Sequence, residues 1–261
     1  MEIICDTNVW YGLANGTLSI PASKDLVLTA SSYFDWFASP MIDRTHQKHN
    51  LLLEAFRAAR RNAARSLLID PFDHPAHKLL NYIPKKQTLK SVELMEELLE
   101  NMARNIYDDD AIRHISTKCR DTKNNIFVGG IKSNNEHLFN LCAEQGGSLA
   151  TGRYKLKKEC VYNSLRKWIM TFPGFRDVVE GDIDWSRIEI FLNVYYRFVN
   201  NKPRRPKPNS MVDLLNFLYL DNRGHQYWSE EKEFLELLRQ SYGNTIPPFI
   251  YEGGHIVNEI F

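Results

Sequence analysis

The chain opens with a short apolar segment that runs directly into an acidic turn. Glu2–Cys5 contains two isoleucines and a cysteine, which predicts a short buried strand. Asp6, Thr7 and Asn8 follow at once, and these residue types favour helix caps and turns. In a parallel α/β sheet, side chains just past the strand ends gather at one edge, where functional crevices lie. Asp6 is therefore the first candidate site residue.

The rest of the chain alternates between strand-like and helix-like segments. We predict further strands over 25–29, 66–69, 225–229 and 248–251. We predict helices over 9–13, 33–37 (capped by Ser31 or Ser32), 44–65, 89–106, 159–172, 188–199, 210–220 and 230–241. The region 108–152 mixes Asn, Gly and short apolar runs and gives no clear assignment. This alternation predicts an α/β fold with a parallel sheet flanked by helices.

The predicted strands lie near the two ends of the chain, and the middle reads as mostly helical. We therefore predict one discontinuous domain formed by 1–80 and 201–261, with a large helical insertion over 81–200. A Pro-rich basic segment, NNKPRRPKPN at 200–209, marks the clearest boundary.

Composition places the chain among ordinary globular proteins. It has 261 residues, 43% of them hydrophobic and 25% charged, with a formal net charge of +1. The sequence shows no signal peptide and no apolar run of about 18 residues, so we expect no membrane span. The four cysteines form no CxxC pair, which favours reduced thiols and a cytoplasmic location.

Acidic residues follow several of the predicted strands. Asp35 lies in the helix after the second strand, Glu231 follows the strand that ends at Ser229, and Asp213 lies in the helix after the basic segment. Carboxylates gathered in one crevice repel one another unless a cation or a proton lies between them. Mg²⁺ and Mn²⁺ take oxygen ligands and keep several waters, so a few acids suffice to bind them.

Four sequence segments together resemble a known family. IICDTNVWYGL resembles the first strand and turn of a PIN domain, and LVLTASSYFDWF is similar to its second strand and helix. NSMVDLLNFLYL resembles the helix with the third acid, and YWSEEKEF resembles the final strand-end motif. The four matches occur in the family's order and cover about a third of the chain. The resemblance implies a PIN-like fold and metal-dependent endonuclease activity, with RNA as the expected substrate.

The resemblance also implies roles for individual residues. Asp6, Asp213 and Glu231 would be ligands of Mg²⁺ or Mn²⁺, with Glu230 as an alternative to Glu231. Asp35 would position metal-bound water.

The two polar residues beside these acids also match the family's motifs. Asn8 and Ser229 would orient the carboxylates through hydrogen bonds.

The chain also departs from the family pattern. It is about twice the usual length, its second acid is Asp35 where Glu is usual, and its last is Glu231 where Asp is usual. These changes leave open a non-catalytic PIN-like module that binds RNA or protein, and an inhibitor or effector protein remains a candidate partner. An unrelated α/β enzyme that uses Asp6 in phosphoryl transfer is a weaker alternative, since D-T-N lacks the second Asp of a D-x-D signature.

Basic residues gather in three segments. Lys202, Arg204, Arg205 and Lys207 lie among prolines shortly before Asp213, so we predict that they contact substrate phosphates. A second cluster around Arg57 has no acid four residues earlier to pair with. A third occupies 153–158.

Two further patterns have a structural and a functional interpretation. Asp108–Asp110 is a weaker candidate for the third acid, and a solvated helix start fits it better. His114 and Cys119, like His137 and Cys142, show an H-x4-C spacing that invites a zinc site. Residues five apart on a helix point about 140° away from each other, so buried cysteines are the preferred interpretation.

Overall fold

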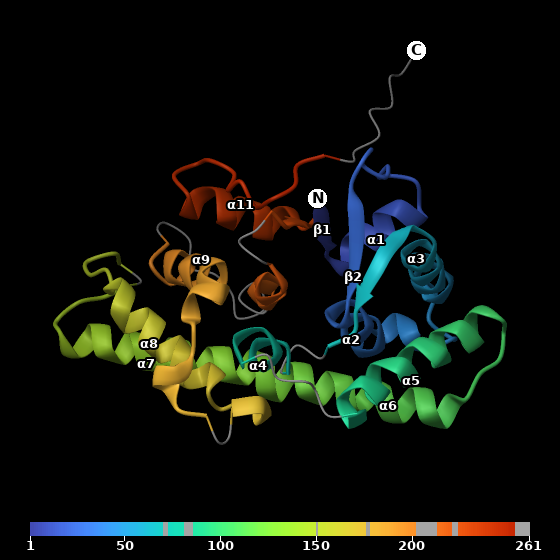
Figure 1. Ribbon diagram of the computed structural model, residues 1–261, viewed down its shortest axis with the longest axis horizontal. Helices are drawn as coiled ribbons and strands as arrows, with labels where there is room; N and C mark the ends of the chain where they lie inside the picture. The colour runs from blue at the N-terminus through green and yellow to red at the C-terminus, as the bar shows by residue number, and fades with distance from the viewer. Residues whose placement is uncertain are drawn as a thin grey trace, which may run out of the picture.

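The structure is a computed structural model in which a small sheet is covered by helices (Figure 1). It describes residues 1–69, 73–80, 86–149, 151–175, 178–201, 213–220 and 224–253. The sheet has four strands: β1 (Glu2–Cys5), β2 (Asp25–Thr29), β3 (Ala63–Leu67) and β4 (Gln226–Trp228). Their order is β3-β2-β1-β4, and every neighbouring pair is parallel. The predicted α/β class with a parallel sheet flanked by helices is confirmed.

The central strands are buried on both faces, as their apolar sequences predict. Ile3 and Ile4 are fully buried, and β1 pairs with β2 in a register that sets Ile4 beside Val27. Ile4 and Val27 belong to one hydrophobic cluster, whereas Ile3 and Leu26 belong to another. Successive side chains of each strand thus enter separate cores on opposite faces of the sheet.

Helices from distant parts of the sequence cover each face. One core includes residues of α1 (Thr7–Ala14), α2 (Ala30–Ala38), α3 (His49–Asn62), α5 (Lys86–Ala103) and α6 (Asp109–Asp121). The other includes residues of α4 (Asp73–Leu80), α7 (Gly129–Glu144), α8 (Lys158–Ile169), α9 (Glu189–Val199), the 3-10 helix η6 (Asp213–Tyr219) and α11 (Lys232–Ser241). The described helices between 86 and 199 therefore contribute to both cores.

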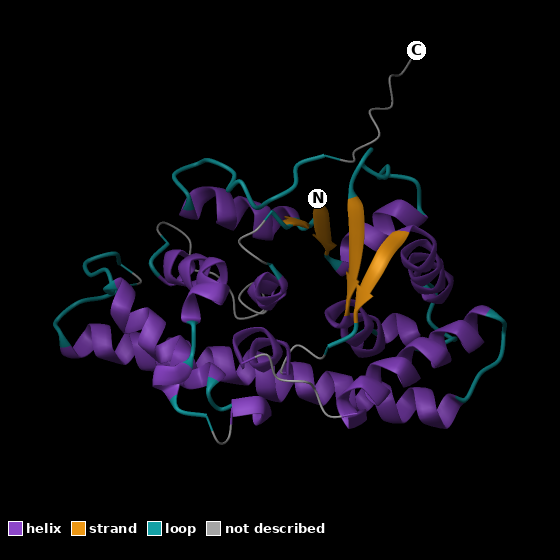
Figure 2. Cartoon of the chain, viewed as in Figure 1, coloured by secondary structure: helices purple, strands orange, loops and turns teal. Residues whose placement is uncertain are grey.

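Two of these helices are joined into one long rod by a π-helical segment, η2 (Thr122–Val128), which lies between α6 and α7. The strand arrows of Figure 2 point toward the side of the sheet where this rod runs. Residues of the predicted insertion therefore lie near the carboxyl ends of the strands, where the acids are.

Several element boundaries differ from the sequence prediction. The third strand begins at Ala63, not Ser66, because β3 is an edge strand with exposed residues and lacks the apolar run that we sought. Helix α2 begins at Ala30 directly after β2, so Thr29 is its N-cap, and the prediction of Ser31 or Ser32 was wrong. The predicted last strand, 248–251, is a single parallel bridge between Tyr227 and Ile250.

Two predicted helices also changed in length or type. The helix predicted over 44–65 runs from His49 to Asn62, because residues 43–48 form turns and residues 63–65 belong to β3. The described part of the helix predicted over 210–220 is 3-10 in form.

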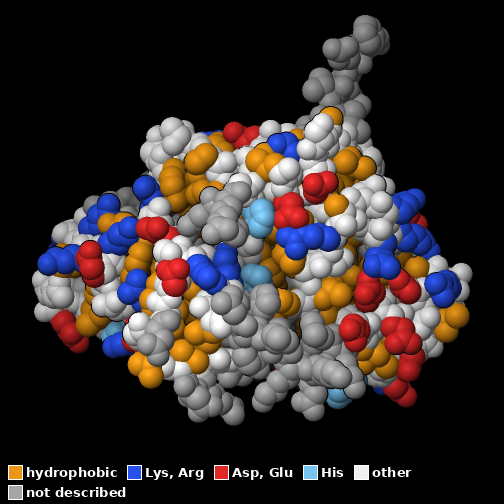
Figure 3. All heavy atoms as spheres, in the orientation of Figure 1, with side chains coloured by type: hydrophobic (Ala, Val, Ile, Leu, Met, Phe, Trp, Pro, Cys, Tyr) orange, Lys and Arg blue, Asp and Glu red, His pale blue; other side chains and the backbone are white. Residues whose placement is uncertain are grey.

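The surface carries both charges. Figure 3 shows acidic and basic side chains interspersed on the visible face, in keeping with the net charge of +1. Among the described residues, no helix combines the length and apolar character that crossing a membrane requires.

Candidate active site

Asp6 lies at the carboxyl end of β1. Its backbone N–H donates to the Trp228 carbonyl at 2.9 Å, which extends the contact between β1 and β4 by one residue. Its side chain caps α1, because Oδ1 accepts a hydrogen bond of 2.7 Å from the Thr7 N–H. The other oxygen, Oδ2, accepts from the Ser229 hydroxyl at 2.8 Å. The carboxylate is therefore fixed by groups from both ends of the chain.

Ser229 and Asn8 form the rest of this network. The Ser229 hydroxyl accepts from the Asn8 amide at 3.5 Å and from the Glu231 N–H at 3.2 Å. The side-chain oxygen Oδ1 of Asn8 accepts from the Glu230 N–H at 3.0 Å. Both residues predicted to orient the acids thus contact them or their neighbouring backbone.

Asp35 joins the cluster from α2. Its Oδ2 accepts from the Thr7 hydroxyl at 2.9 Å, which links it to the residue after Asp6. Its Oδ1 lies 2.9 Å from Nζ of Lys123, and both side chains are partly exposed. Asp35 is therefore neutralised by a lysine that comes from the segment between α6 and α7.

Asp213 is the first described residue of η6, a segment anchored in the core. The next residues, Leu214 and Leu215, are buried, and the Asn216 amide donates to the Tyr227 hydroxyl of β4 at 3.1 Å. Burial raises the pKa of Asp213 well above its usual range, and the charges of Asp6, Glu231 and Asp35 raise it further.

The same electrostatics act on Asp6. Burial raises its pKa to about 6, and the charge of Asp35 adds to the increase, while the hydrogen bond from Ser229 opposes it. Glu231 also raises the pKa of Asp6. The four predicted acids therefore interact electrostatically although they come from four separate segments of the chain.

The two adjacent glutamates differ in their surroundings. Glu231 influences both Asp6 and Asp213, whereas the Glu230 carboxylate accepts a hydrogen bond of 2.6 Å from the Trp228 indole. This arrangement favours Glu231 as the fourth acid of the cluster.

Lys123 is the site residue that sequence reasoning missed. The Asp35 carboxylate beside it raises the pKa of Lys123, and Asp213 and Asp6 act in the same direction. Its sequence context, TKNNIF, lies in the region that gave no clear assignment and resembles no PIN motif that we recognised. The sequence offered only a lysine in a polar stretch as a signal. In the structure Lys123 lies in a π-helical segment, and such segments are frequent at functional sites.

The donor chemistry suits a hard divalent cation. Burial and the neighbouring carboxylates raise the pKa values of Asp6 and Asp213, and a bound divalent cation would offset this repulsion. As the side chains stand, the described residues contain no group of three or more His, Cys, Asp or Glu that could hold a metal ion. A metal bound by Asp6, Asp213 and Glu231 would therefore require these carboxylates to move.

The predicted phosphate-contacting residues belong to the basic segment 200–209. Lys202, Arg204, Arg205 and Lys207 lie outside the described residues, so their predicted contact with phosphates stays a prediction.

The Arg57 cluster is largely paired. Arg57 lies 2.5 Å from Glu54, and Arg60 contacts Glu96 and Glu100 of α5. We looked for acids four residues earlier in the sequence and so did not predict these partners. Glu54 lies three residues before Arg57, and Glu96 and Glu100 belong to another helix.

The alternative sites have structural explanations. Asp108 caps α6 by accepting from the Ala111 N–H at 3.0 Å, with Asp109 and Asp110 in the first turn, as the helix-start interpretation predicts. Cys119 and Cys142 are buried in different cores.

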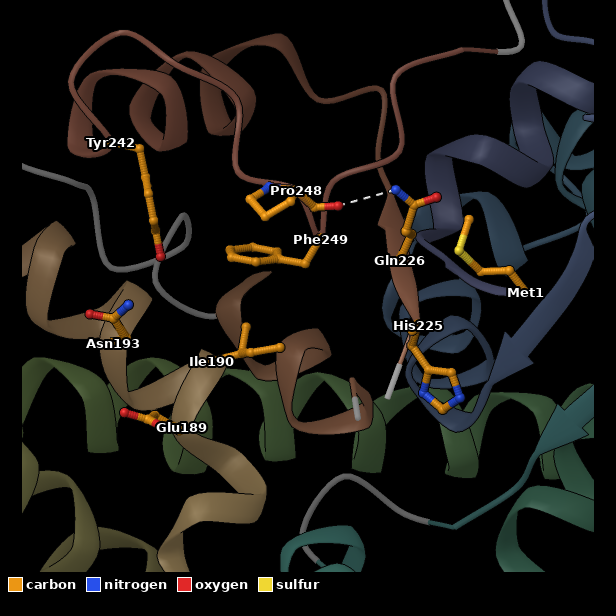
Figure 4. A pocket seen from close by; sticks show the side chains of 10 residues that line it. Met1, Glu189, Ile190, Asn193, His225, Gln226, Tyr242, Pro248 and Phe249 are labelled. Carbon is orange, nitrogen blue, oxygen red and sulfur yellow. Dashed lines mark hydrogen bonds between the residues drawn. The ribbon is translucent and has the colours of Figure 1, made fainter. Parts of the chain in front are cut away.

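A described cavity lies at the opposite end of the sheet. It has a volume of about 600 Å³, and Met1 and His225, which precede β1 and β4, line it together with Tyr242 and Phe249 (Figure 4). The acids follow the carboxyl ends of these strands, so this cavity is separate from the acid cluster.

The chain was compared with protein-family models, curated proteins and solved structures, and none of these comparisons found a match.

Proposed function

We propose that this protein is a metal-dependent endonuclease of the PIN-like type that hydrolyses phosphodiester bonds, with RNA as its expected substrate. The observation that supports it most is the Asp6–Ser229–Asn8 network at the carboxyl ends of β1 and β4. This network joins the two motifs, D-T-N and S-E-E, that carry the resemblance. The preference for RNA comes from that resemblance and from no contact in the fold.

The proposal assigns a role to each residue of the cluster. Asp6, Asp213 and Glu231 would hold the cation. When bound, the cation would lower the pKa of a water molecule and stabilise charge on the phosphate. Ser229 keeps Asp6 oriented through its 2.8 Å hydrogen bond. Asp35, held by Thr7 on one oxygen, would orient the attacking water. Lys123 reduces the net negative charge that an incoming phosphate would meet.

A second candidate has a specific observation in its favour. Lys123 already neutralises Asp35, and no described group of three potential ligands is arranged around a metal position. A lysine in place of a metal would suit a non-catalytic module that binds RNA or protein. Because the carboxyls of Asp6 and Asp213 have raised pKa values despite Lys123, the catalytic proposal takes precedence.

The decisive experiment is a cleavage assay on a panel of labelled single-stranded and duplex RNA and DNA, with Mn²⁺ or Mg²⁺ and with EDTA. We expect metal-dependent products from the wild type and none from Asp6→Asn. Asp25→Asn, which removes the same charge from an exposed position, is the matched control and should cleave normally. Failure of the wild type to cleave any substrate would favour the non-catalytic module.

A further inference from the structure

A second concave site lies between the segment 42–45 and helix α6. Its volume is about 470 Å³, and Arg44, Arg113 and Arg120 line it together with the hydroxyl residues Ser116 and Thr117. Helix α6 leads directly into η2, which carries Lys123. The cavity and Lys123, which pairs with Asp35 of the acid cluster, therefore lie along one continuous helical path.

The spacing along α6 places the basic groups in a row. Arg113, Ser116, Thr117 and Arg120 are separated by three, four and seven residues from the first, which sets them on one face of a helix. With a rise of 1.5 Å per residue, Arg113 and Lys123 are ~15 Å apart along the axis, about the length of a few nucleotides.

The charges of the cavity are not fully compensated within it. Three arginines and two acids line it, so the arginines outnumber the acids, and one acid pairs with a lining arginine. Asp109 pairs with Arg44 at 2.8 Å, and Asp43 accepts hydrogen bonds from the backbone and hydroxyl of Thr45. Arg113 is 75% exposed and lies 3.8 Å from an acid that is itself 95% exposed, a weak pair.

Arg120 has more donors than its contact uses. Its Nε donates to the Ala38 carbonyl at 3.2 Å, which fixes the side chain at the end of α2. Within the described residues, its guanidinium lies in no ion pair. The buried hydroxyl of Ser116, on the same face, has no hydrogen-bond partner among these residues. The site thus offers fixed donors for an anion.

We infer that this cavity binds backbone phosphates of a nucleic-acid strand and guides the strand along α6 toward Lys123 and the acid cluster. The inference rests on the proposed function for the identity of the strand. Arginine suits this role because its planar group donates two parallel hydrogen bonds to a phosphate. The Arg57 surface is a poorer candidate because Arg57 and Arg60 are occupied by Glu54, Glu96 and Glu100.

The test is binding of a fluorescent single-stranded RNA, and of the same sequence as DNA, measured by anisotropy at several salt concentrations. Ca²⁺ or EDTA would replace Mn²⁺, so the readout does not depend on cleavage. Arg113→Gln with Arg120→Gln should weaken binding by about tenfold or more, and should reduce the steepness of the salt dependence by about 1.4 for two lost phosphate contacts.

Two further variants keep the result interpretable. Arg61→Gln with Arg104→Gln removes the same charge from another basic cavity and should bind as the wild type does. Arg113→Glu alone, at an exposed position, should weaken binding without any effect on folding.

Three outcomes would overturn the inference: no binding of either oligonucleotide by the wild type, unchanged affinity and salt dependence in the α6 variants, or an equal loss in the control pair. A wild type that binds through Arg113 and Arg120 but cleaves nothing would contradict the proposed function alone.

Discussion

The hydroxyl of Ser229 donates a 2.8 Å hydrogen bond to Oδ2 of Asp6, across 223 positions of the sequence. The same oxygen of Ser229 accepts from Asn8 and from the Glu231 N–H. One small side chain therefore ties the first acid of the cluster to the segment that carries the last.

Removal of this hydroxyl should impair the site more than the fold. We expect Ser229→Ala to reduce cleavage by about 10- to 100-fold, because groups that orient metal ligands have effects of this size. The free energy of unfolding should fall by about 1–2 kcal/mol, owing to lost hydrogen bonds. Ser229→Thr keeps a hydroxyl and is the control. Cleavage assays and thermal unfolding would check both values, and normal activity of Ser229→Ala would contradict the role.

The raised pKa of Asp6 predicts that its charge opposes folding. The pKa is 3.8 in the unfolded chain and about 6 in the folded protein, so the folded state binds more protons between these values. Stability should therefore fall as the pH rises through this window, and the full penalty should remain above pH 6.

Asp6→Asn should accordingly stabilise the protein at pH 8, by about 1–2 kcal/mol after the loss of one accepted hydrogen bond. The gain should shrink as the pH falls from 6 toward 3.8 and should vanish well below pH 3.8, where Asp6 is protonated in both states. Urea unfolding at the two pH values measures it. Asp25→Asn, on an exposed residue, should show no such difference. A destabilised Asp6→Asn protein at pH 8 would show that the carboxylate stabilises the fold.

Divalent metal should bind more tightly as the pH rises. Asp6 and Asp213 both have raised pKa values, so a cation that binds them must displace protons. Calorimetric titration with Mn²⁺ should show affinity that increases above pH 6 and proton release that depends on the buffer. Asp213→Asn should weaken binding and reduce the proton release. Affinity that does not change with pH would argue against these two acids as ligands.

Lys123 should compete with metal for the acid cluster. We expect Lys123→Gln to raise Mn²⁺ affinity, because it frees Asp35 and removes a positive charge near Asp213. Without metal the variant should be less stable than the wild type, since the acids lose this counter-ion. Lys118→Gln, an exposed lysine of α6, removes the same charge elsewhere and is the control. Weaker Mn²⁺ binding by Lys123→Gln than by the control would refute competition.

The strands nearest the site were the elements that local sequence predicted best. Glu2–Cys5 and Asp25–Thr29 match their predicted bounds because both are short apolar runs bounded by turn-forming or charged residues. The edge strand β3 and the 3-10 helix η6 were less predictable, since edge exposure and tertiary packing, not periodicity, define them. The region 108–152 gave no assignment, yet it holds α6, η2 and α7. The buried face of α7 includes the polar Asn134, which weakens its apolar pattern. In α6, by contrast, Ile112, Ile115 and Cys119 do follow helical spacing.

The sequence by itself determined the residue types and their order: a strand that ends in Asp6, a later strand that ends before Ser229, and acids spaced between them. Those patterns are local, and they do not depend on how the segments are arranged in space. Only the tertiary structure decided that β4 pairs beside β1, which brings Ser229 to Asp6. It also decided that Lys123, 88 residues after Asp35, supplies the positive charge at the cluster. Such contacts depend on how helices pack across the strand ends, and no local propensity encodes that arrangement.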